Sequence, residues 1–170
     1  MILERNDSGS IEAPVADVFH CFWRAELWPM LTDHVVKVEM LEEQDGYQRY
    51  AMHVSVEGKK YTMETQRISV APRSISFQQP KPPVFMRSHS GIWTFEQGPL
   101  ATKVSVAHRL DVDDQKAMET LAVGSTEDAR RKIMGNLERN GMAMIDSVNA
   151  FLKSTEGKTL MEDKVAVEVK

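Results

Sequence analysis

The sequence predicts an α+β fold in which a curved antiparallel sheet wraps around one long C-terminal helix. Strand-type alternation of apolar and polar residues continues from Val35 to Val112. The connections within this region are too short to hold crossover helices, so successive strands must pair antiparallel. The last third of the chain holds one long amphipathic helix. A sheet that curls around a helix can leave an internal cavity, and that cavity is the natural binding site.

The first thirty residues predict one strand and two short helices. Residues 3–12 form the strand, and Pro14 suits the first turn of a helix because its missing N–H is harmless there. A second short helix is expected over residues 24–31. The apolar residues of the first helix recur at helical spacing: Val15, Val18, Phe19 and Phe22.

Six further strands are expected, separated by turn residues. Gly46 marks one turn, and Glu57-Gly58 is a tight hairpin signal. The segment Gln79–Pro83 contains three prolines and is expected to be a loop, because proline cannot donate to a central ladder. The expected strands begin at Val35 and then span Tyr47–Val56, Lys59–Val70, Ser74–Gln78, Val84–Glu96 and Thr102–Val112.

The most clearly marked element is the helix that follows Ser125. Ser125 is a favourable N-cap, and Glu127 and Asp128 oppose the helix dipole in the first turn. Gly141 falls near the apolar stripe, where glycine costs about 0.5–1 kcal/mol relative to alanine. We therefore expect a strand or a ligand to approach closely there. The apolar stripe consists of Ile133, Leu137, Met144, Val148 and Phe151.

Length and composition favour one small domain. The 170 residues carry a net charge of -4 with no basic run, which argues against nucleic-acid binding. No apolar segment approaches the ~18 residues of a membrane span, and the N-terminus lacks a secretory signal, so we expect a cytoplasmic protein. We expect one domain over residues 1–153 and a flexible tail over residues 154–170. The apolar residues Val165–Val169 are expected to be disordered or to add a strand.

Neither a metal nor a cofactor is expected. The single cysteine, Cys21, lies between Phe19 and Trp23 and is interpreted as a buried structural thiol. The five histidines fall on different expected elements without the spacing of zinc ligands. Glycine-rich phosphate-binding loops are also absent from the sequence.

Three stretches of the chain carry a family resemblance. They are Ser10–Phe19, Trp28–Leu31 with Val38–Leu41, and Thr65–Arg67 with Ile92–Phe95. In these stretches the chain resembles the polyketide aromatase/cyclases of the START-like superfamily, especially the tetracenomycin type, and the likeness spans roughly residues 8–152. The first two stretches are shared across the superfamily and indicate the fold. Arg67 in its strand indicates the cyclase branch.

The resemblance implies a helix-grip fold with a deep pocket. In that pocket a poly-β-ketone tethered to an acyl carrier protein would be folded, cyclised by aldol condensation and dehydrated to an aromatic ring. The resemblance assigns the pocket arginine to Arg67, its neighbours to Thr65 and Met63, and the pocket tryptophan to Trp93. It also implies contact with the ketosynthase complex and a monomer or homodimer.

One departure from the family pattern concerns proton transfer. Family members often have a tyrosine after the Trp-Pro helix, where this chain has His34-Val35. If that tyrosine is the proton donor elsewhere, its role here is either vacant or taken by His34.

Strand parity gives an independent reason to place Arg67 in the cavity. Residues 61, 63, 65 and 67 share one face of their strand, and that face is the less polar one. A buried charge needs a partner or a function. Arg67 therefore forms a salt bridge, reaches the pocket mouth with its head group, or stabilises a developing enolate inside a dry cavity.

Proton transfer requires a second group, and three further residues are candidates. His89 and His108 both lie on strand faces that carry apolar residues, and Tyr50 alternates with apolar neighbours. Each has an alternative interpretation, as a hydrogen-bonded core histidine or a core tyrosine with its hydroxyl at the surface. Arg87 shares the predicted face of His89, which argues against complete burial of that face. The expected substrate-binding residues are Trp28, Tyr61, Met63, Thr65, Phe85, Trp93 and Met144.

Two other functions suit the same fold. One is non-catalytic transport of a hydrophobic small molecule such as a lipid or quinone. The other is an interaction module whose cavity is vestigial. A cyclase predicts polar groups deep in the pocket. A carrier predicts an almost entirely apolar pocket with Arg67 at the rim or paired, and a vestigial domain predicts a filled cavity with an exposed apolar patch.

Overall fold

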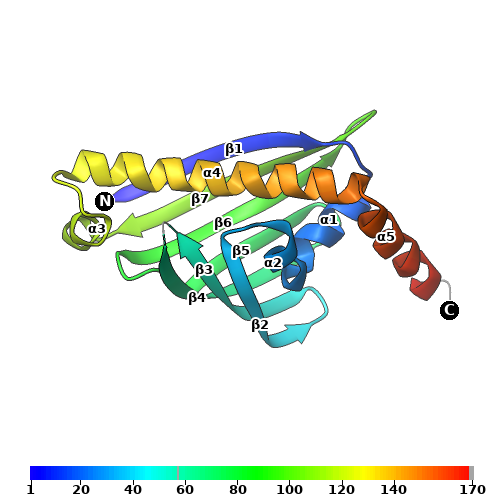
Figure 1. The fold of residues 1–170 in the computed structure, drawn as a ribbon, viewed down its shortest axis with the longest axis horizontal. Helices are drawn as coiled ribbons and strands as arrows, with labels where there is room; N and C mark the ends of the chain where they lie inside the picture. The colour runs from blue at the N-terminus through cyan, green and yellow to red at the C-terminus, as the bar shows by residue number, and fades with distance from the viewer. Residues whose placement is uncertain (57, 169–170) are drawn as a thin grey trace.

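The computed structural model describes residues 1–56 and 58–168, with side chains to residue 164. It confirms the α+β prediction: one seven-stranded antiparallel sheet curves around a long helix (Figure 1). The strand order is β1-β7-β6-β5-β4-β3-β2, so β2 to β7 form a continuous meander and β1 pairs with the last strand. The strands are β1 Ile2–Ile11, β2 Val35–Gln44, β3 Tyr47–Val56, β4 Lys59–Val70, β5 Ser74–Lys81, β6 Met86–Gln97 and β7 Thr102–Val112.

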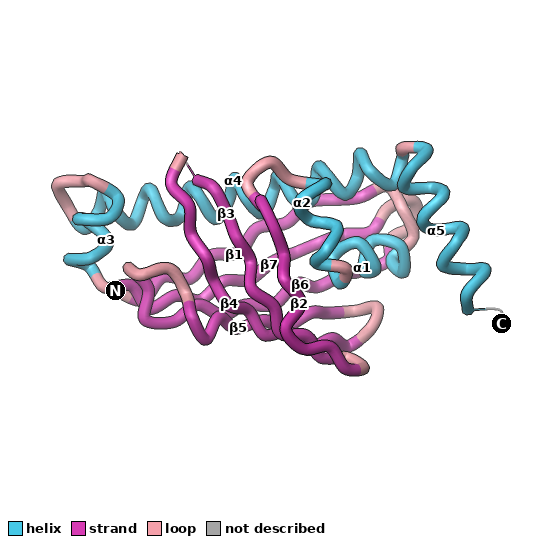
Figure 2. The backbone as a smooth tube through the Cα atoms, turned by 60° about the horizontal axis from the view of Figure 1, so that its bottom comes forward, coloured by secondary structure: helices cyan, strands magenta, loops and turns pink. Residues whose placement is uncertain are grey.

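The helices cover the concave face and one end of this sheet. Helix α4 runs along the sheet, and Figure 2 shows β2, β3 and β4 extending toward it beside α2. The Ser125 side chain accepts a hydrogen bond from the Asp128 N–H, as predicted for its N-cap. The helices are α1 Val15–Trp23, the 3-10 turn η1 Ala25–Leu27, α2 Trp28–Leu31, α3 Asp114–Leu121, α4 Thr126–Lys153 and α5 Thr155–Glu168.

Strand β5 is longer than predicted. The expected loop began at Gln79, whereas β5 continues to Lys81 and includes Pro80. Residue pairing shows how proline is tolerated: the β4–β5 register shifts between Glu64 and Gln66, and β6 pairs with β5 only as far as Gln78. Pro80 thus lies where a bulge interrupts one ladder and the other has ended. The predicted hairpin turn retains Gly58 at φ 78°, while Glu57 lies outside the described residues.

Helix α3 was not predicted from the sequence. Asp113 caps it by accepting a hydrogen bond from the Lys116 N–H, and Ala117 is fully buried against the sheet and α4. Lys59 Nζ donates a 3.2 Å hydrogen bond to the Thr120 carbonyl and joins the β3–β4 hairpin to this helix. The tertiary position of α3, which covers one end of the sheet, stabilises a segment with a weak apolar pattern.

The C-terminal segment is also helical where it is described. Backbone from Val165 to Glu168 belongs to α5, so the expected strand is wrong there, and Val169 lies outside the described residues. Ser154 Oγ accepts a 3.1 Å hydrogen bond from the Gly157 N–H, and Met161 packs in the core. The cap and the apolar contacts of Leu160 and Met161 with the core together stabilise this helix after α4.

The buried apolar residues form two clusters with the cavity between them. One lies under α1 and the C-terminal half of α4, and the other lies under α3 and the N-terminal half of α4. Cys21 belongs to the first cluster, and burial raises the pKa of its thiol to about 12, as expected for a structural cysteine. The close approach expected at Gly141 is not found in the structure, because a Cβ there would lie 3.7 Å from Val106 Cγ1 of β7, which is an ordinary van der Waals contact. None of the described helices has the length and apolarity of a membrane span.

Candidate active site

A cavity of about 240 Å³ lies between the concave face of the sheet and helices α2 and α4. All the site residues predicted from the sequence line it, and those on strands do so because strand alternation directs one face of each strand toward α4. Its walls are mainly apolar, and its buried polar groups gather at two places, one around Arg67 and one around His89. The predicted residues in the lining are Trp28, His34, Tyr50, Tyr61, Met63, Thr65, Arg67, Phe85, His89, Trp93, His108 and Met144.

The Arg67 guanidinium is buried and caps the C-terminal end of helix α1. The residue is 2% exposed and lies on the inward face of β4. Its Nη1 donates to the Phe22 carbonyl at 2.7 Å, and its Nη2 donates to the Trp23 carbonyl at 2.5 Å and to Gln48 Oε1. The two carbonyls belong to the last turn of α1, where the helix dipole favours a cation. Neither the expected salt bridge nor a position at the pocket mouth accounts for Arg67.

Three aromatic rings surround the same guanidinium. Its Cζ lies 5.0 Å from the Trp23 ring centroid, 5.1 Å from that of Trp28 and 5.0 Å from that of Tyr50. Cation–π attraction at such distances is strongest in a desolvated site. Burial lowers the pKa of Arg67, but a guanidinium remains protonated at physiological pH. The cavity therefore has a permanent positive charge at one end.

Two buried polar atoms at this end have no hydrogen-bond partner among the described residues. They are Arg67 Nε and Thr65 Oγ1. The two residues lie on the same face of β4, and both line the cavity. Unsatisfied buried donors are rare in native proteins because each costs free energy. Arg67 Nε can donate a hydrogen bond to an oxygen atom of a bound ligand if the side chain shifts slightly toward the cavity, and the Thr65 hydroxyl, which also interacts with the Tyr50 hydroxyl, can rotate toward the same oxygen.

Tyr50 packs beside Arg67 with its side chain completely buried. It is 1% exposed, and its ring meets the Trp28 ring edge-on at 6.3 Å between centroids. Burial raises the pKa of the Tyr50 hydroxyl, and the nearby Arg67 charge opposes this shift. The hydroxyl therefore stays protonated, and the alternative of a hydroxyl at the surface is wrong.

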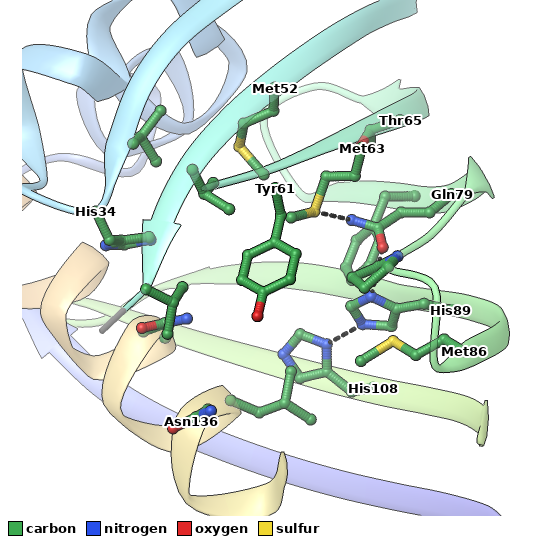
Figure 3. Close-up of a pocket in the computed structure, with 18 of the residues that line it drawn as sticks. His34, Met52, Tyr61, Met63, Thr65, Gln79, Met86, His89, His108 and Asn136 are labelled. Carbon is green, nitrogen blue, oxygen red and sulfur yellow. Dashed lines mark hydrogen bonds between the residues drawn. The ribbon is translucent and has the colours of Figure 1, made fainter. Parts of the chain in front are cut away.

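His89 and His108 form a hydrogen-bonded pair at the other polar end (Figure 3). His89 Nε2 lies 3.0 Å from His108 Nδ1, and His89 Nδ1 lies 2.9 Å from Gln79 Oε1. Phe77 contacts both imidazoles edge-on, with centroid distances of 5.4 and 5.6 Å. Burial lowers the pKa of His89 to about 3 and that of His108 to about 4. Both rings are therefore neutral at pH 7.

A β-bulge explains why His89 is buried although Arg87 is not. The β6–β7 register shifts between Met86 and Ser88, so strand parity changes there. Arg87 points outward and forms ion pairs with Asp111 and Asp113 at 3.1 and 3.3 Å.

His34 lies apart from this pair. It lines the cavity near the start of β2, and Figure 3 shows it across the cavity from His89 and His108. Burial lowers the pKa of the His34 imidazole. The Tyr61 hydroxyl points into the space between these groups in the same view.

Three residues at the two polar ends of the cavity were missed from the sequence. Gln48 precedes Tyr50 by two positions, so the parity that places Tyr50 inward gives the same orientation to Gln48. Gln79 lay in the segment expected to be a loop, and no local signal placed it beside His89. Phe77 faces the imidazoles only because of strand register. Among the described residues, no group of three His, Cys, Asp or Glu side chains is arranged to hold a metal ion.

Comparison with known proteins identifies the family. Residues 11–138 match the sequence profile of "Polyketide cyclase / dehydrase and lipid transport". The chain belongs to this family. Among curated members, it is 29% identical over 144 residues to the granaticin polyketide synthase bifunctional cyclase/dehydratase of Streptomyces virginiae, covering 84% of this chain and 47% of that protein. It is 30% identical over 149 residues to the actinorhodin polyketide synthase bifunctional cyclase/dehydratase of Streptomyces coelicolor, covering 80% and 46%.

Solved aromatase/cyclase structures share the fold. The di-domain ARO/CYC BexL from the BE-7585A biosynthetic pathway superposes with a TM-score of 0.82 at 25% identity, covering 90% of this chain and 50% of that one. The Zhui aromatase/cyclase from Streptomyces sp. R1128 superposes with a TM-score of 0.75 at 21% identity, covering 88% of this chain and 93% of that one. The chain thus spans about half the length of the curated relatives that it matches.

Proposed function

We propose that this chain is a polyketide aromatase/cyclase, which folds a poly-β-ketone in its cavity, closes a ring by aldol condensation and dehydrates the product to an aromatic ring. One observation carries the proposal: Arg67 and Thr65, whose Nε and Oγ1 atoms are buried without a geometric hydrogen-bond partner among the described residues, line the same apolar cavity as a neutral histidine pair. An aldol reaction needs donors for a developing oxyanion and a base for a carbon-bound proton.

The two polar ends of the cavity have complementary roles in this reaction. His108 takes a proton from a methylene carbon between two ketones, and the resulting enolate carbon forms a bond to a second carbonyl carbon. Arg67 and Thr65 donate hydrogen bonds to the oxygen that gains negative charge. The alkoxide then takes up a proton, and loss of water removes that hydroxyl together with a neighbouring carbon-bound proton. His34, His89 and Tyr50 are the further candidates for moving these protons.

The apolar walls select the fold of the substrate. Such ketone chains cyclise spontaneously, so the protein mainly decides which carbons meet. Flat rings and flexible thioethers restrict a chain without binding any one carbonyl. These walls are formed by Trp28, Tyr61, Met63, Phe85, Trp93 and Met144.

The proposal includes a setting for the reaction. The substrate would arrive tethered to an acyl carrier protein, in contact with a ketosynthase complex in the cytoplasm. Support comes from the curated relatives, which are polyketide synthase cyclase/dehydratases. Residues 1–153 would form the catalytic domain, as a monomer or homodimer.

A carrier of hydrophobic small molecules is the second candidate. The contacts of Arg67 favour a carrier. Its guanidinium already donates hydrogen bonds to Phe22, Trp23 and Gln48, which is the pattern expected of an arginine with a purely structural role. The family name also includes lipid transport. A carrier does not need the unsatisfied donors at Thr65 and Arg67, so their function separates the two candidates.

Product profiling with a minimal polyketide synthase tests the proposal. Wild-type protein should convert a mixture of spontaneous products into mainly one aromatic compound. Thr65→Val preserves shape but removes the hydroxyl, and the loss of one oxyanion donor should slow that conversion about 100-fold. Thr62→Val, on the outer face of the same strand, is the matched control and should behave like wild type. If wild-type protein leaves the products of several chain lengths unchanged, the cyclase proposal fails and the carrier stands.

A further inference from the structure

Four side chains form a continuous row along one wall of the cavity. Gln79 Nε2 donates to Met63 Sδ at 3.2 Å, Gln79 Oε1 lies 2.9 Å from His89 Nδ1, and His89 Nε2 lies 3.0 Å from His108 Nδ1 (Figure 3). The row crosses four strands, because Met63 lies in β4, Gln79 in β5, His89 in β6 and His108 in β7.

The direction of every hydrogen bond in this row follows from its first member. A thioether sulfur has no hydrogen to donate, so the Gln79 amide presents its NH₂ group to Met63. The Gln79 carbonyl oxygen then faces His89 Nδ1 and can only accept, which requires the proton of neutral His89 on Nδ1. His89 Nε2 therefore holds a lone pair and accepts a hydrogen bond from the Nδ1–H group of His108.

The last atom of the row is left with an unprotonated lone pair. Because His108 carries its single proton on Nδ1, its Nε2 is free to act as a base. If either ring carried its proton on Nε2 instead of Nδ1, one junction of the row would place a donor against a donor or an acceptor against an acceptor.

We propose that Met63 and Gln79 are positioning residues that fix the tautomers of His89 and His108, so that His108 Nε2 is the base of the site. The catalytic part of this inference rests on the proposed cyclase function, whereas the tautomers themselves do not. His89 then acts as a relay: when His108 Nε2 takes a proton, the Nδ1 proton can move to His89 Nε2 and share the positive charge.

Packing around the two rings maintains this geometry. Phe77 contacts both imidazoles edge-on, and Gly91 leaves the space that the Phe77 ring occupies. A Cβ at Gly91 would lie 2.5 Å from Phe77 Cζ. Rings held in this way cannot rotate freely to exchange donors and acceptors.

Charged groups also lie near the pair. Arg5 on β1 lowers the pKa of His108 and Asp7 raises it, while Arg5 Nε donates to Asp7 Oδ2 at 2.7 Å. Arg5 also forms a 2.8 Å ion pair with Glu138 of α4. These charges are paired with one another, so the neutral state of the two rings depends mainly on their burial.

NMR spectroscopy of protein labelled with ¹³C and ¹⁵N at histidine tests the tautomers directly. In the wild type, the ring nitrogen signals of both His89 and His108 should show the proton on Nδ1. Gln79→Leu removes the acceptor and should abolish this tautomer preference in both rings. Gln79→Glu keeps an acceptor oxygen and should retain it. Met63→Leu should weaken it, because the Gln79 amide is then free to turn, whereas the matched control Met86→Leu should not.

Two NMR results would overturn the inference. One is an Nε2–H tautomer of His108 in the wild type, and the other is an unchanged tautomer in Gln79→Leu. In the cyclisation assay, Gln79→Leu should lower kcat about 10- to 100-fold with little change in KM, and Gln79→Glu should restore it. If the tautomers are as stated but wild-type protein does not alter polyketide products, the proposed function fails alone.

Discussion

Arg67 Nη1 donates a 2.7 Å hydrogen bond to the main-chain carbonyl of Phe22, in the last turn of α1. The pocket arginine therefore stabilises the fold as well as facing the cavity. Loss of activity after its substitution would not by itself prove a catalytic role, which is why Thr65 is the cleaner test of the proposed oxyanion site.

This double role predicts a loss of stability in Arg67→Ala. The change leaves two helix-terminal carbonyls and Gln48 without their donor and empties a space lined by three rings. The free energy of unfolding should fall by about 2–4 kcal/mol in urea denaturation. Arg67→Lys keeps the charge but not the fork of donors, so its loss should be smaller. Equal stability of Arg67→Ala and wild type would contradict the helix-end role.

Gly91→Ala should disturb the histidine pair. A Cβ there would lie 2.3 Å from the Ala107 carbonyl oxygen and 2.5 Å from Phe77 Cζ, so strand and ring must both move. We expect a loss of about 1–3 kcal/mol of unfolding free energy and altered ring signals of His89 and His108. In Gly135→Ala, the only close group is the flexible end of Arg139, and helix propensity should raise stability by about 0.5–1 kcal/mol. Similar effects in the two variants would refute this reading of Gly91.

Stability should depend on pH through the buried histidines. The pKa values of His89 and His108 are lowered to about 3 and about 4, so the unfolded chain binds protons at a higher pH than the folded one. The free energy of unfolding therefore keeps its full value above about pH 6.5. It falls as the pH drops toward 4, by up to about 1.4 kcal/mol per pH unit for each ring.

Urea denaturation at successive pH values measures this slope. His108→Gln should reduce it. Carboxylates with lowered pKa values, such as Glu64, lose their contribution only below about pH 4.5, so the two windows are separate. A flat profile between pH 6.5 and 4.5 would contradict burial of the neutral pair.

Gly157→Ala should release α5 from the end of α4. A Cβ at Gly157 would lie 2.0 Å from the Phe151 carbonyl oxygen, so the turn around Ser154 cannot keep its geometry. Amide hydrogen exchange across α5 should become faster, while exchange in the sheet stays unchanged. Gly124→Ala, with no atom within 4 Å of its Cβ, is the control. Unchanged exchange in α5 would show that the turn adapts at no cost.

The strands and the long helix were predictable because their signals are local. Alternation along β4 identified the inward face that carries Thr65 and Arg67, and the Ser125 cap located the start of α4. Helix α3 and the extension of β5 were missed for the opposite reason. A weakly apolar helix is stabilised by its neighbours, and Pro80 is tolerated only because one ladder bulges and the other ends beside it.

The sequence by itself determined which face of β3 and β4 is directed into the cavity, because the two-residue period of a strand orients each residue through its own backbone. Only the tertiary structure decided which of them meet. His89 reaches His108 and Gln79 through the register of three strands, and Arg67 reaches the end of α1 through the curvature of the sheet. Register and curvature depend on contacts between residues far apart in the chain, and no local pattern records them.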